Sequence, residues 1–467
     1  MINSIDRRFF PWLVYILFSL PFFGLAFIIS LVSNNVLTFF QAYGALSPTD
    51  TNSIILFNEI IILVLLPFVG YLVDKNFKFT KKLGRYYPWI IISGVILAFL
   101  PLALFSSDLT DYLAALIFTS SPLANLSAFF FVLFYEVVYL FFRLAIYSLI
   151  FNKFRNTKER LIISTLSLFL DNLGGIISIF IFADVITYYR ISSYLSAANI
   201  AVIVFLIFFG IGQFGLLEES QLLDIYSYQT LPPRKAFFKD FFQKFSVFKN
   251  KNFVILGLLW VGTSAFSIFF LGNLSLYLHY ILNQSVVVSI FYNLTFIFSS
   301  FIGIPVGFVL SWFIGQRKTY IISGFLLATS LILFPFLELI QLLLMSIMGI
   351  ALTLTFITFL PLMGDVFDQQ ANITKKRSDG FYYGTINLFN QLTYILGPII
   401  ILNITDLTGF DWSGFIHTDL ANWGLLLNFT LIPGVIILIT TILFGVFFDL
   451  KSEKIRKIQA DLKELII

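Results

Sequence analysis

Cysteine is absent from the 467 residues, so the chain can form no disulfide, no thiolate metal site and no cysteine nucleophile. Histidine is almost absent as well. The only two, His279 and His417, fall near the expected outer ends of apolar runs, so no metal cluster or histidine-activated nucleophile is indicated. Charged residues make up 12% of the chain, against roughly a quarter in soluble domains. These absences argue against an enzyme, a cofactor or metal site, and a soluble protein.

Long apolar runs account for most of the chain, which is 59% hydrophobic. About 20 apolar residues are enough for a helix to cross a bilayer. Twelve runs reach this length: 11–40, 53–73, 86–106, 126–151, 161–184, 194–217, 253–282, 287–314, 319–338, 341–364, 381–404 and 421–448. The sequence therefore predicts an all-α polytopic membrane protein with twelve transmembrane helices in two six-helix bundles.

The polar stretches divide this chain into four predicted parts. They are an N-terminal bundle at 1–217, a cytoplasmic linker at 218–252, a C-terminal bundle at 253–448 and a tail at 449–467. The tail alternates apolar and charged residues as an amphipathic helix does, and we expect it to support the protein from the membrane surface.

The positive charges predict the orientation of the spans. With the N-terminus inside, all of the 29 Lys and Arg lie on the cytoplasmic side except Arg143, within a span, and Arg190, outside. Arg7 and Arg8 precede the first apolar run, which lacks a cleavage site and is expected to remain as a span. We therefore predict a multi-pass protein of the cell membrane with both termini cytoplasmic.

The two halves repeat a basic loop. Residues 156–160 and 373–377 both carry Thr-Lys and end on Arg, and each precedes a new span. Two sets of six spans in parallel, joined by a basic linker, are typical of major facilitator transporters.

Four ionisable residues fall deep within spans, where each charge costs several kcal/mol and is a functional candidate. They are Glu59, Glu136, Arg143 and Asp171. At 1.5 Å per residue, Arg143 and Asp171 lie roughly 12 to 15 Å from the cytoplasmic helix ends, and the two glutamates roughly 21 to 22 Å. Arg143 and Asp171 are therefore predicted to lie at one depth in the membrane, and Glu59 and Glu136 at a greater depth from the cytoplasmic side.

Arg143 and Asp171 have two interpretations. A buried ion pair between them would only lock two helices together. Alternatively, they bind substrate hydroxyls while Tyr147, one turn from Arg143, offers its ring to an apolar sugar surface. Glu59 and Glu136 then remain as candidates for coupling to a cation, H⁺ or Na⁺, unless they face lipid or stay protonated.

The second half offers amides and hydroxyls at depth instead of charges. Asn387, Asn390 and Gln391 share one helix face, and we expect them to line a central cavity with Tyr147 and Arg143. Trp260, Thr263 and the nearby serines form a similar face near residue 260, but such groups often only hydrogen-bond a neighbouring helix.

Three segments resemble the glycoside-pentoside-hexuronide cation symporters, the melibiose-carrier branch of the major facilitator superfamily. They run from Pro67 through Gly70 and Asp74 to Arg85 and Trp89, from Tyr147 to Arg160, and from Met363 through Asp365 and Asp368 to Arg377 and Gly380. The resemblance covers both halves in matching order. It implies cation-coupled uptake of sugars or sugar acids, although relatives of this fold also carry lipids.

Several positions depart from the pattern of that family. Its two helix 2 acids, which serve the cation, fall on Leu66 and Ile62, so Glu59 could replace them only from a shifted position. Its helix 4 acid falls on Arg143 and its helix 11 lysine on Gln391. The resemblance therefore implies the fold and the gate motifs, but not the sugar and sodium chemistry residue by residue.

Asp74 with Arg85, and Asp365 with Arg377, are predicted to form a cytoplasmic gate in which acid-base pairs and helix ends close short basic loops. The alternative is that they only anchor loops and fix topology.

We expect a secondary active transporter that works by alternating access and symports a small hydroxylated solute, a sugar or sugar derivative, with a cation. The expected partners are this solute, the coupling cation and the bilayer, with a monomeric chain. The net charge of +4 gives no reason to expect nucleic acid. Two alternatives stay open: an amphiphile or lysolipid carrier of the same fold, suggested by the 60 Phe, and a membrane scaffold or receptor.

Overall fold

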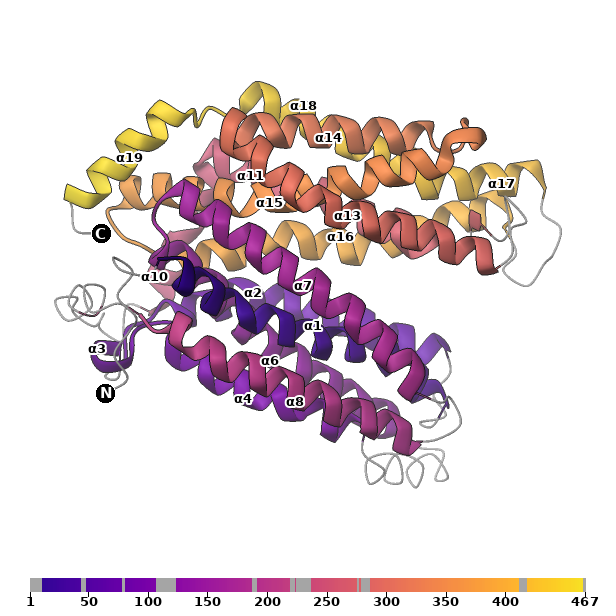
Figure 1. Cartoon of the computed structure of the whole chain (residues 1–467), viewed down its shortest axis with the longest axis horizontal. Helices are drawn as coiled ribbons and strands as arrows, with labels where there is room; N and C mark the ends of the chain where they lie inside the picture. The colour runs from indigo at the N-terminus through magenta and orange to yellow at the C-terminus, as the bar shows by residue number, and fades with distance from the viewer. Residues whose placement is uncertain are drawn as a thin grey trace. The chain divides into compact units, whose positions relative to one another are not determined.

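A computed structural model describes residues 11–42, 48–77, 80–105, 123–186, 191–218, 223, 237–274, 277–278, 286–410 and 418–464. All regular structure in these ranges is helical, which confirms the predicted class. The first half contains α1 (Pro11–Ala42), α2 (Pro48–Val73), α3 (Thr80–Leu83), α4 (Tyr87–Leu104), α6 (Leu123–Lys153), α7 (Thr157–Val185) and α8 (Ile191–Leu216) (Figure 1). The two histidines, Arg7, Arg8 and Arg190 lie outside the described residues.

The second half begins with a short helical segment before its spans. It contains α10 (Phe237–Lys244), η2 (Phe245–Lys249), α11 (Lys251–Ala265), η3 (Phe266–Phe270), η4 (Leu271–Asn273), α13 (Val286–Ile314), α14 (Gln316–Leu333), η6 (Glu338–Ile340), α15 (Gln341–Thr374), α16 (Asp379–Thr408), α17 (Asp419–Leu426), η7 (Leu427–Leu431), α18 (Ile432–Phe447) and α19 (Ser452–Glu464). The π-helical turns η3 and η7 lie within the predicted spans 253–282 and 421–448. In each of them the hydrogen bonds join residues i and i+5, so the turn contains one residue more than an α-helical turn and is locally wider.

Eleven helical segments in the described ranges are long and apolar enough to cross a membrane. The remaining predicted span, 319–338, corresponds to α14, which has 18 residues and starts with Gln316, Arg317 and Lys318. Its polar first turn lowers its average hydropathy, while its other residues are mostly apolar. The protein is therefore a multi-pass membrane protein.

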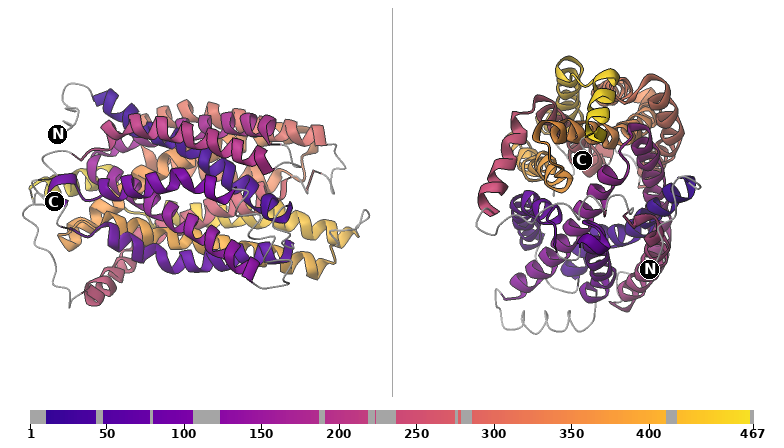
Figure 2. Two further views of the ribbon diagram at one scale, coloured as in Figure 1. Left: turned by 90° about the horizontal axis from the view of Figure 1, so that it is seen from below. Right: turned by 90° about the vertical axis from the view of Figure 1, so that its left-hand side faces the viewer.

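The contacts divide the chain into two units. Unit 1 comprises 1–155, 166–240 and 378–384, and unit 2 comprises 156–165, 241–377 and 385–467. Two helices, α7 and α16, thus contribute residues to both units. Within unit 1, α1 packs along α8, and α2 and α4 pack on α6. Within unit 2, α13 and α14 pack on α15, while α11 and α14 pack on α18; the long helices within each unit run roughly side by side (Figure 2).

Phenylalanine fills much of the core of unit 2. Phe270, Phe334 and Phe429 are fully buried, with ring centroids between 4.5 and 5.9 Å apart. Such pairs add to the free energy of burial because aromatic edges and faces attract one another. A large part of the phenylalanine content therefore serves helix packing.

The tail forms the predicted amphipathic helix, α19, but its apolar side is covered by protein. Ile458 and Leu462 are 7% and 4% exposed, and α19 packs against α15 within unit 2 (Figure 1). α19 is therefore held on unit 2 by its apolar side, and its location at the membrane surface stays a prediction.

Candidate functional site

Ionisable and aromatic residues gather in unit 1 around Arg143. We call this group the Arg143 cluster. It consists of Glu59 of α2, Glu136, Tyr139, Arg143 and Tyr147 of α6, Asp171 of α7 and Tyr383 of α16. Successive members on α6 are three, four and four positions apart, so one side of the helix presents all of them.

Two stacked tyrosine rings lie beside the guanidinium. The rings of Tyr147 and Tyr383 are stacked with centroids 4.9 Å apart, and Phe22 packs edge-on against Tyr147 at 5.8 Å. Tyr383 is also a hydrogen-bonding partner of Arg143. The cluster therefore combines a donor-rich cation with aromatic ring faces. Sequence reasoning did not select Tyr383, since a tyrosine 236 residues after Tyr147 gives no sign that it lies next to it.

Arg143 and Asp171 have the same tyrosine neighbours. Tyr139 and Tyr147 each interact electrostatically with both of them. The structure thus places the two charges in one cluster, while their direct pairing stays a prediction.

The two deep glutamates belong to the same cluster. Glu136 is repelled by the charge of Glu59 and attracted by that of Arg143. Two carboxylates within interaction range in a low-dielectric region compete for one counter-charge. The coupling role of Glu59 and Glu136 stays a prediction.

The predicted amides of the second half lie in unit 2, on α16. Asn387 and Gln391 are buried, and the indole N–H of Trp260 donates to Asn387 Oδ1 over 3.3 Å. Ser264 donates a hydrogen bond to Asn390. These bonds join the α16 amides to the polar face of α11, which is the helix-packing role considered for such groups. Whether the amides also share a cavity with the Arg143 cluster stays a prediction.

The predicted gate residues lie at helix ends joined by basic loops, and they form two separate contact sets that we call the latches. The latch of unit 1 is built on Asp74, which directly follows α2 and is 8% exposed. Its carboxylate accepts hydrogen bonds from the backbone N–H groups of Gly380 at 2.9 Å and Phe381 at 2.8 Å. Tyr86 Oη donates to it over 3.0 Å. A carboxylate thus binds backbone amides of the first turn of α16 that have no partner within the helix, where the helix dipole favours a negative charge.

Glycines allow α2 and α16 to meet at the latch of unit 1. A Cβ atom on Gly70 would lie 2.3 Å from the carbonyl oxygen of Gly380, and one on Gly384 would lie 2.4 Å from that of Leu66. Any side chain at these positions would push the backbones apart. Gly380 and Gly384 are four residues apart, which is the small-residue spacing of closely packed membrane helices.

Arg85 and the start of α4 are held by two further polar residues. Arg85 Nε donates to Asn76 Oδ1 over 2.9 Å, and the backbone N–H of Tyr86 donates to Glu218 Oε1 over 2.7 Å. Glu218 therefore binds the N-terminal end of α4 as Asp74 binds that of α16. Sequence reasoning assigned Glu218 only to the linker.

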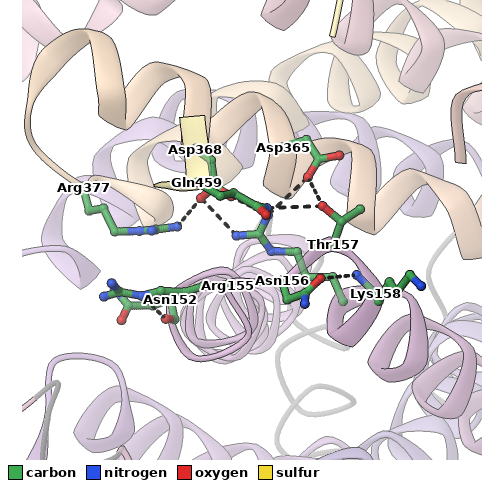
Figure 3. Close-up of polar contacts among 10 residues, drawn as sticks. Asn152, Arg155, Asn156, Thr157, Lys158, Asp365, Asp368, Arg377 and Gln459 are labelled. Carbon is green, nitrogen blue, oxygen red and sulfur yellow. Dashed lines mark hydrogen bonds and ion pairs between the residues drawn. The ribbon is translucent and has the colours of Figure 1, made fainter. Parts of the chain in front are cut away.

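The latch of unit 2 is a buried ion cluster (Figure 3). Arg160 of α7 is 0% exposed and donates two hydrogen bonds to Asp368 of α15, at 2.8 and 3.0 Å. Asp365 accepts a hydrogen bond from Thr157 Oγ1 at 2.7 Å and lies 3.6 Å from Arg160. Arg377 pairs with Asp368 at 2.7 Å, where the sequence suggested Asp365 as its partner. Asp368 is therefore the centre of this latch.

Gly364 and Gln459 complete the latch of unit 2. A Cβ atom on Gly364 would lie 2.5 to 2.6 Å from the Arg160 side chain, so the guanidinium lies directly over this glycine. Gln459 of α19 donates to Thr157 Oγ1 at 3.3 Å and to Asp368 Oδ2 at 3.4 Å (Figure 3). Sequence reasoning placed Arg160 in a repeated basic motif without giving it a role, although the motif was a usable signal.

Among the described residues, no group of three or more His, Asp and Glu has a geometry that could hold a metal ion.

A protein-family model matches the chain over nearly its full length. The model of the family described as "MFS/sugar transport protein" matches residues 17–452. No curated protein matches the chain.

Solved structures share the fold at low sequence identity. The proton:xylose symporter XylE, bound to 6-bromo-6-deoxy-D-glucose, is 11% identical with a TM-score of 0.62, over 97% of this chain and 100% of that one. The E. coli fucose:proton symporter FucP is 14% identical with a TM-score of 0.55, over 94% of this chain and 98% of that one. A bacterial homologue of the iron transporter ferroportin, in its outward-facing state, is 11% identical with a TM-score of 0.62, over 93% and 98%. At these identities the likeness shows the fold alone.

Proposed function

We propose that this protein is a cation-coupled symporter of a small hydroxylated solute. The chain belongs to the MFS/sugar transport protein family, and it is therefore a secondary transporter rather than an enzyme. The three motif segments support placing it in the glycoside-pentoside-hexuronide branch. A sugar or sugar derivative is the proposed substrate class.

The observation that carries this proposal is the Arg143 cluster. A guanidinium offers five N–H donors to hydroxyl oxygens, and the stacked rings of Tyr147 and Tyr383 offer a flat apolar surface beside it. Sugars present both hydroxyl edges and apolar C–H faces, so a site of this composition suits them. Asp171 supplies an acceptor for hydroxyl protons in the same cluster.

We assign ion coupling to Glu59 and Glu136. Binding of a proton or Na⁺ would relieve their repulsion and change the charge seen by Arg143. Such a link between ion binding and the substrate site is what symport requires, because each ligand must change the affinity for the other.

Alternating access requires an end of the transport path to open and close, and we assign part of this role to the two latches. Both consist of contacts between helix ends that can be broken without unfolding a helix. The predicted cytoplasmic location of these ends follows from their basic loops.

Uptake into proteoliposomes tests the proposal. The purified chain should accumulate at least one member of a panel of radiolabelled sugars and sugar acids under an imposed proton or sodium gradient. Glu59→Gln and Glu136→Gln should abolish accumulation but retain exchange of substrate across the membrane, because exchange needs no net cation movement. Glu453→Gln, at an exposed position of α19, is the matched control and should behave like the parent.

Two outcomes would contradict parts of this assignment. If both Gln variants accumulate substrate like the parent, the coupling role of the glutamates is wrong. If no sugar is carried but a lysolipid is, the chain is an amphiphile carrier of the same fold.

A further inference from the structure

The segment between the predicted bundles exposes phenylalanine rings. Residues 241–251, which we call the Phe/Lys segment, comprise the last turn of α10, η2 and the first residue of α11. Phe242 is 65% exposed and Phe248 is 38% exposed. One turn before Phe242 on the same helix, Phe238 is 70% exposed. Exposed aromatic rings at successive turns of an amphipathic helix mark a surface that binds something apolar.

These rings continue into the core of unit 2. The centroids of Phe241 and Phe245 are 5.3 Å apart, and those of Phe245 and Phe248 are 6.2 Å apart. Phe248 in turn packs edge-on against Phe253 at 5.9 Å, and Phe253 is fully buried at the start of α11. The exposed rings are thus the outer end of a packed aromatic row.

Hydrogen bonds fix the end of the segment to α15. The Asn250 amide donates to the side chains of Gln369 and Gln370, at 3.2 Å each. Asn252 donates to Gln369 at 3.0 Å and to Asp449. Because the segment is anchored in this way, its exposed rings keep a defined position.

The segment is positively charged. It carries Lys244, Lys249 and Lys251 and no acidic residue, and directly before it the charges of Lys239 and Asp240 cancel. Lys251 is also the first residue of α11, and the membrane-crossing stretch Lys251–Asn273 begins there. Since the segment ends where a span starts, it lies at the boundary between bilayer and water.

We propose that the Phe/Lys segment is a docking surface for anionic lipid. Its exposed phenylalanines enter the headgroup region of the surrounding bilayer, and its three lysines bind the negatively charged headgroups. Apolar insertion and electrostatic attraction to anionic lipid add together in surface-bound amphipathic helices. The proposal is independent of the transported substrate.

Spin labels on single cysteines test this proposal in the full-length protein, because the chain has no cysteine of its own. The label is placed at Phe242→Cys, with Gln243→Cys as the matched control, since Gln243 is also exposed but is a polar neighbour. Both proteins are reconstituted into nanodiscs of phosphatidylcholine, with or without phosphatidylglycerol. Collision rates with oxygen and with a water-soluble nickel chelate then give the depth of each label.

With phosphatidylglycerol, the label at 242 should lie about 5 to 10 Å below the phosphates, while the label at 243 stays open to nickel. Without the anionic lipid, or in the variant Lys244→Gln/Lys249→Gln/Lys251→Gln, the nickel collision rate at 242 should rise to that at 243. Phe238→Cys provides a second position if the first variant does not fold.

Three results would overturn the proposal. The first is a label at 242 that is open to nickel in discs with phosphatidylglycerol. The second is a label that is shielded from both nickel and oxygen, as a covering protein surface would shield it. The third is a depth of the label that is the same with and without the anionic lipid.

Discussion

The two latches hold helix ends together through different partners. In unit 1, Asp74 binds backbone amides at the first turn of α16. In unit 2, Asp368 binds the guanidinium of Arg160 on the first turn of α7, and Arg377 binds the same carboxylate. The latch of unit 1 thus uses backbone amides, which are unpaired at the start of every helix. The latch of unit 2 uses arginine side chains, which depend on the sequence.

This difference predicts different weaknesses. The latch of unit 1 depends on close approach of two backbones, so it is sensitive to the size of the residue at glycine positions. The latch of unit 2 depends on balanced buried charge, since two arginines face Asp365 and Asp368 with almost no exposure to water. Removing one member of a buried set leaves an uncompensated charge, which costs more than the pair itself contributes.

The largest effect is expected from Arg160→Met. It removes a buried positive charge and leaves Asp365 and Asp368 with Arg377 alone. We expect the free energy of unfolding, measured by chemical denaturation in detergent micelles, to fall by about 3–5 kcal/mol.

The double variant Arg160→Met/Asp365→Asn tests the cause of this loss. It restores the balance of charge, because Asp368 keeps Arg377 as its partner. It should therefore be more stable than Arg160→Met alone. If the second substitution lowers stability further, shape rather than charge holds the latch of unit 2, and the contrast with unit 1 disappears.

A smaller effect is expected from Gly70→Ala in unit 1. The added methyl group would lie 2.3 Å from the Gly380 carbonyl oxygen, so α2 and α16 must separate. Overpacking of this kind costs about 1–3 kcal/mol of unfolding free energy. Gly210→Ala on α8 is the matched control, because its methyl group meets nothing within 4 Å, and its stability should be unchanged or higher.

Equal losses at Gly70 and Gly210 would contradict this account. They would show that a glycine-to-alanine change in any span of unit 1 is harmful, and that the latch does not depend on the close backbone approach.

The sequence was sufficient to predict the helices but not their ends. The apolar run 341–364 marks the span of α15, yet the helix continues to Thr374. Asp365 and Asp368 of this extension are buried because they have partners on α7 and at Arg377. Hydropathy cannot detect such a continuation, since the partner residues are distant in the chain.

The candidate site was predictable only where a residue violated the apolar pattern. Glu136 and Arg143 stood out because a charge within a span is costly, and they do belong to one cluster. Tyr383 gave no such signal, as tyrosine is ordinary in an apolar run. Arg160 also gave no such signal, because an arginine is expected in a basic loop. Its complete burial could therefore not be predicted from the sequence.

The smallest predicted effect concerns Gln459 of α19, and it tests whether side-chain hydrogen bonds hold the latch of unit 2. Gln459 donates long hydrogen bonds of 3.3 and 3.4 Å to Thr157 and Asp368. Gln459→Ala should lower the unfolding free energy by about 0.5–1 kcal/mol, the usual net value of such bonds. Lys457→Ala, at an exposed position of the same helix, is the control and should change the unfolding free energy by no more than about a few tenths of a kcal/mol.

The decisive comparison is a double-mutant cycle of Gln459→Ala with Asp368→Asn. If Gln459 acts on the charged latch, its substitution should cost less once Asp368 is neutral, because the bond to a carboxylate is the stronger one. Fully additive losses would instead mean that α19 stabilises unit 2 only by packing Ile458 and Leu462 on α15, with no share in the latch.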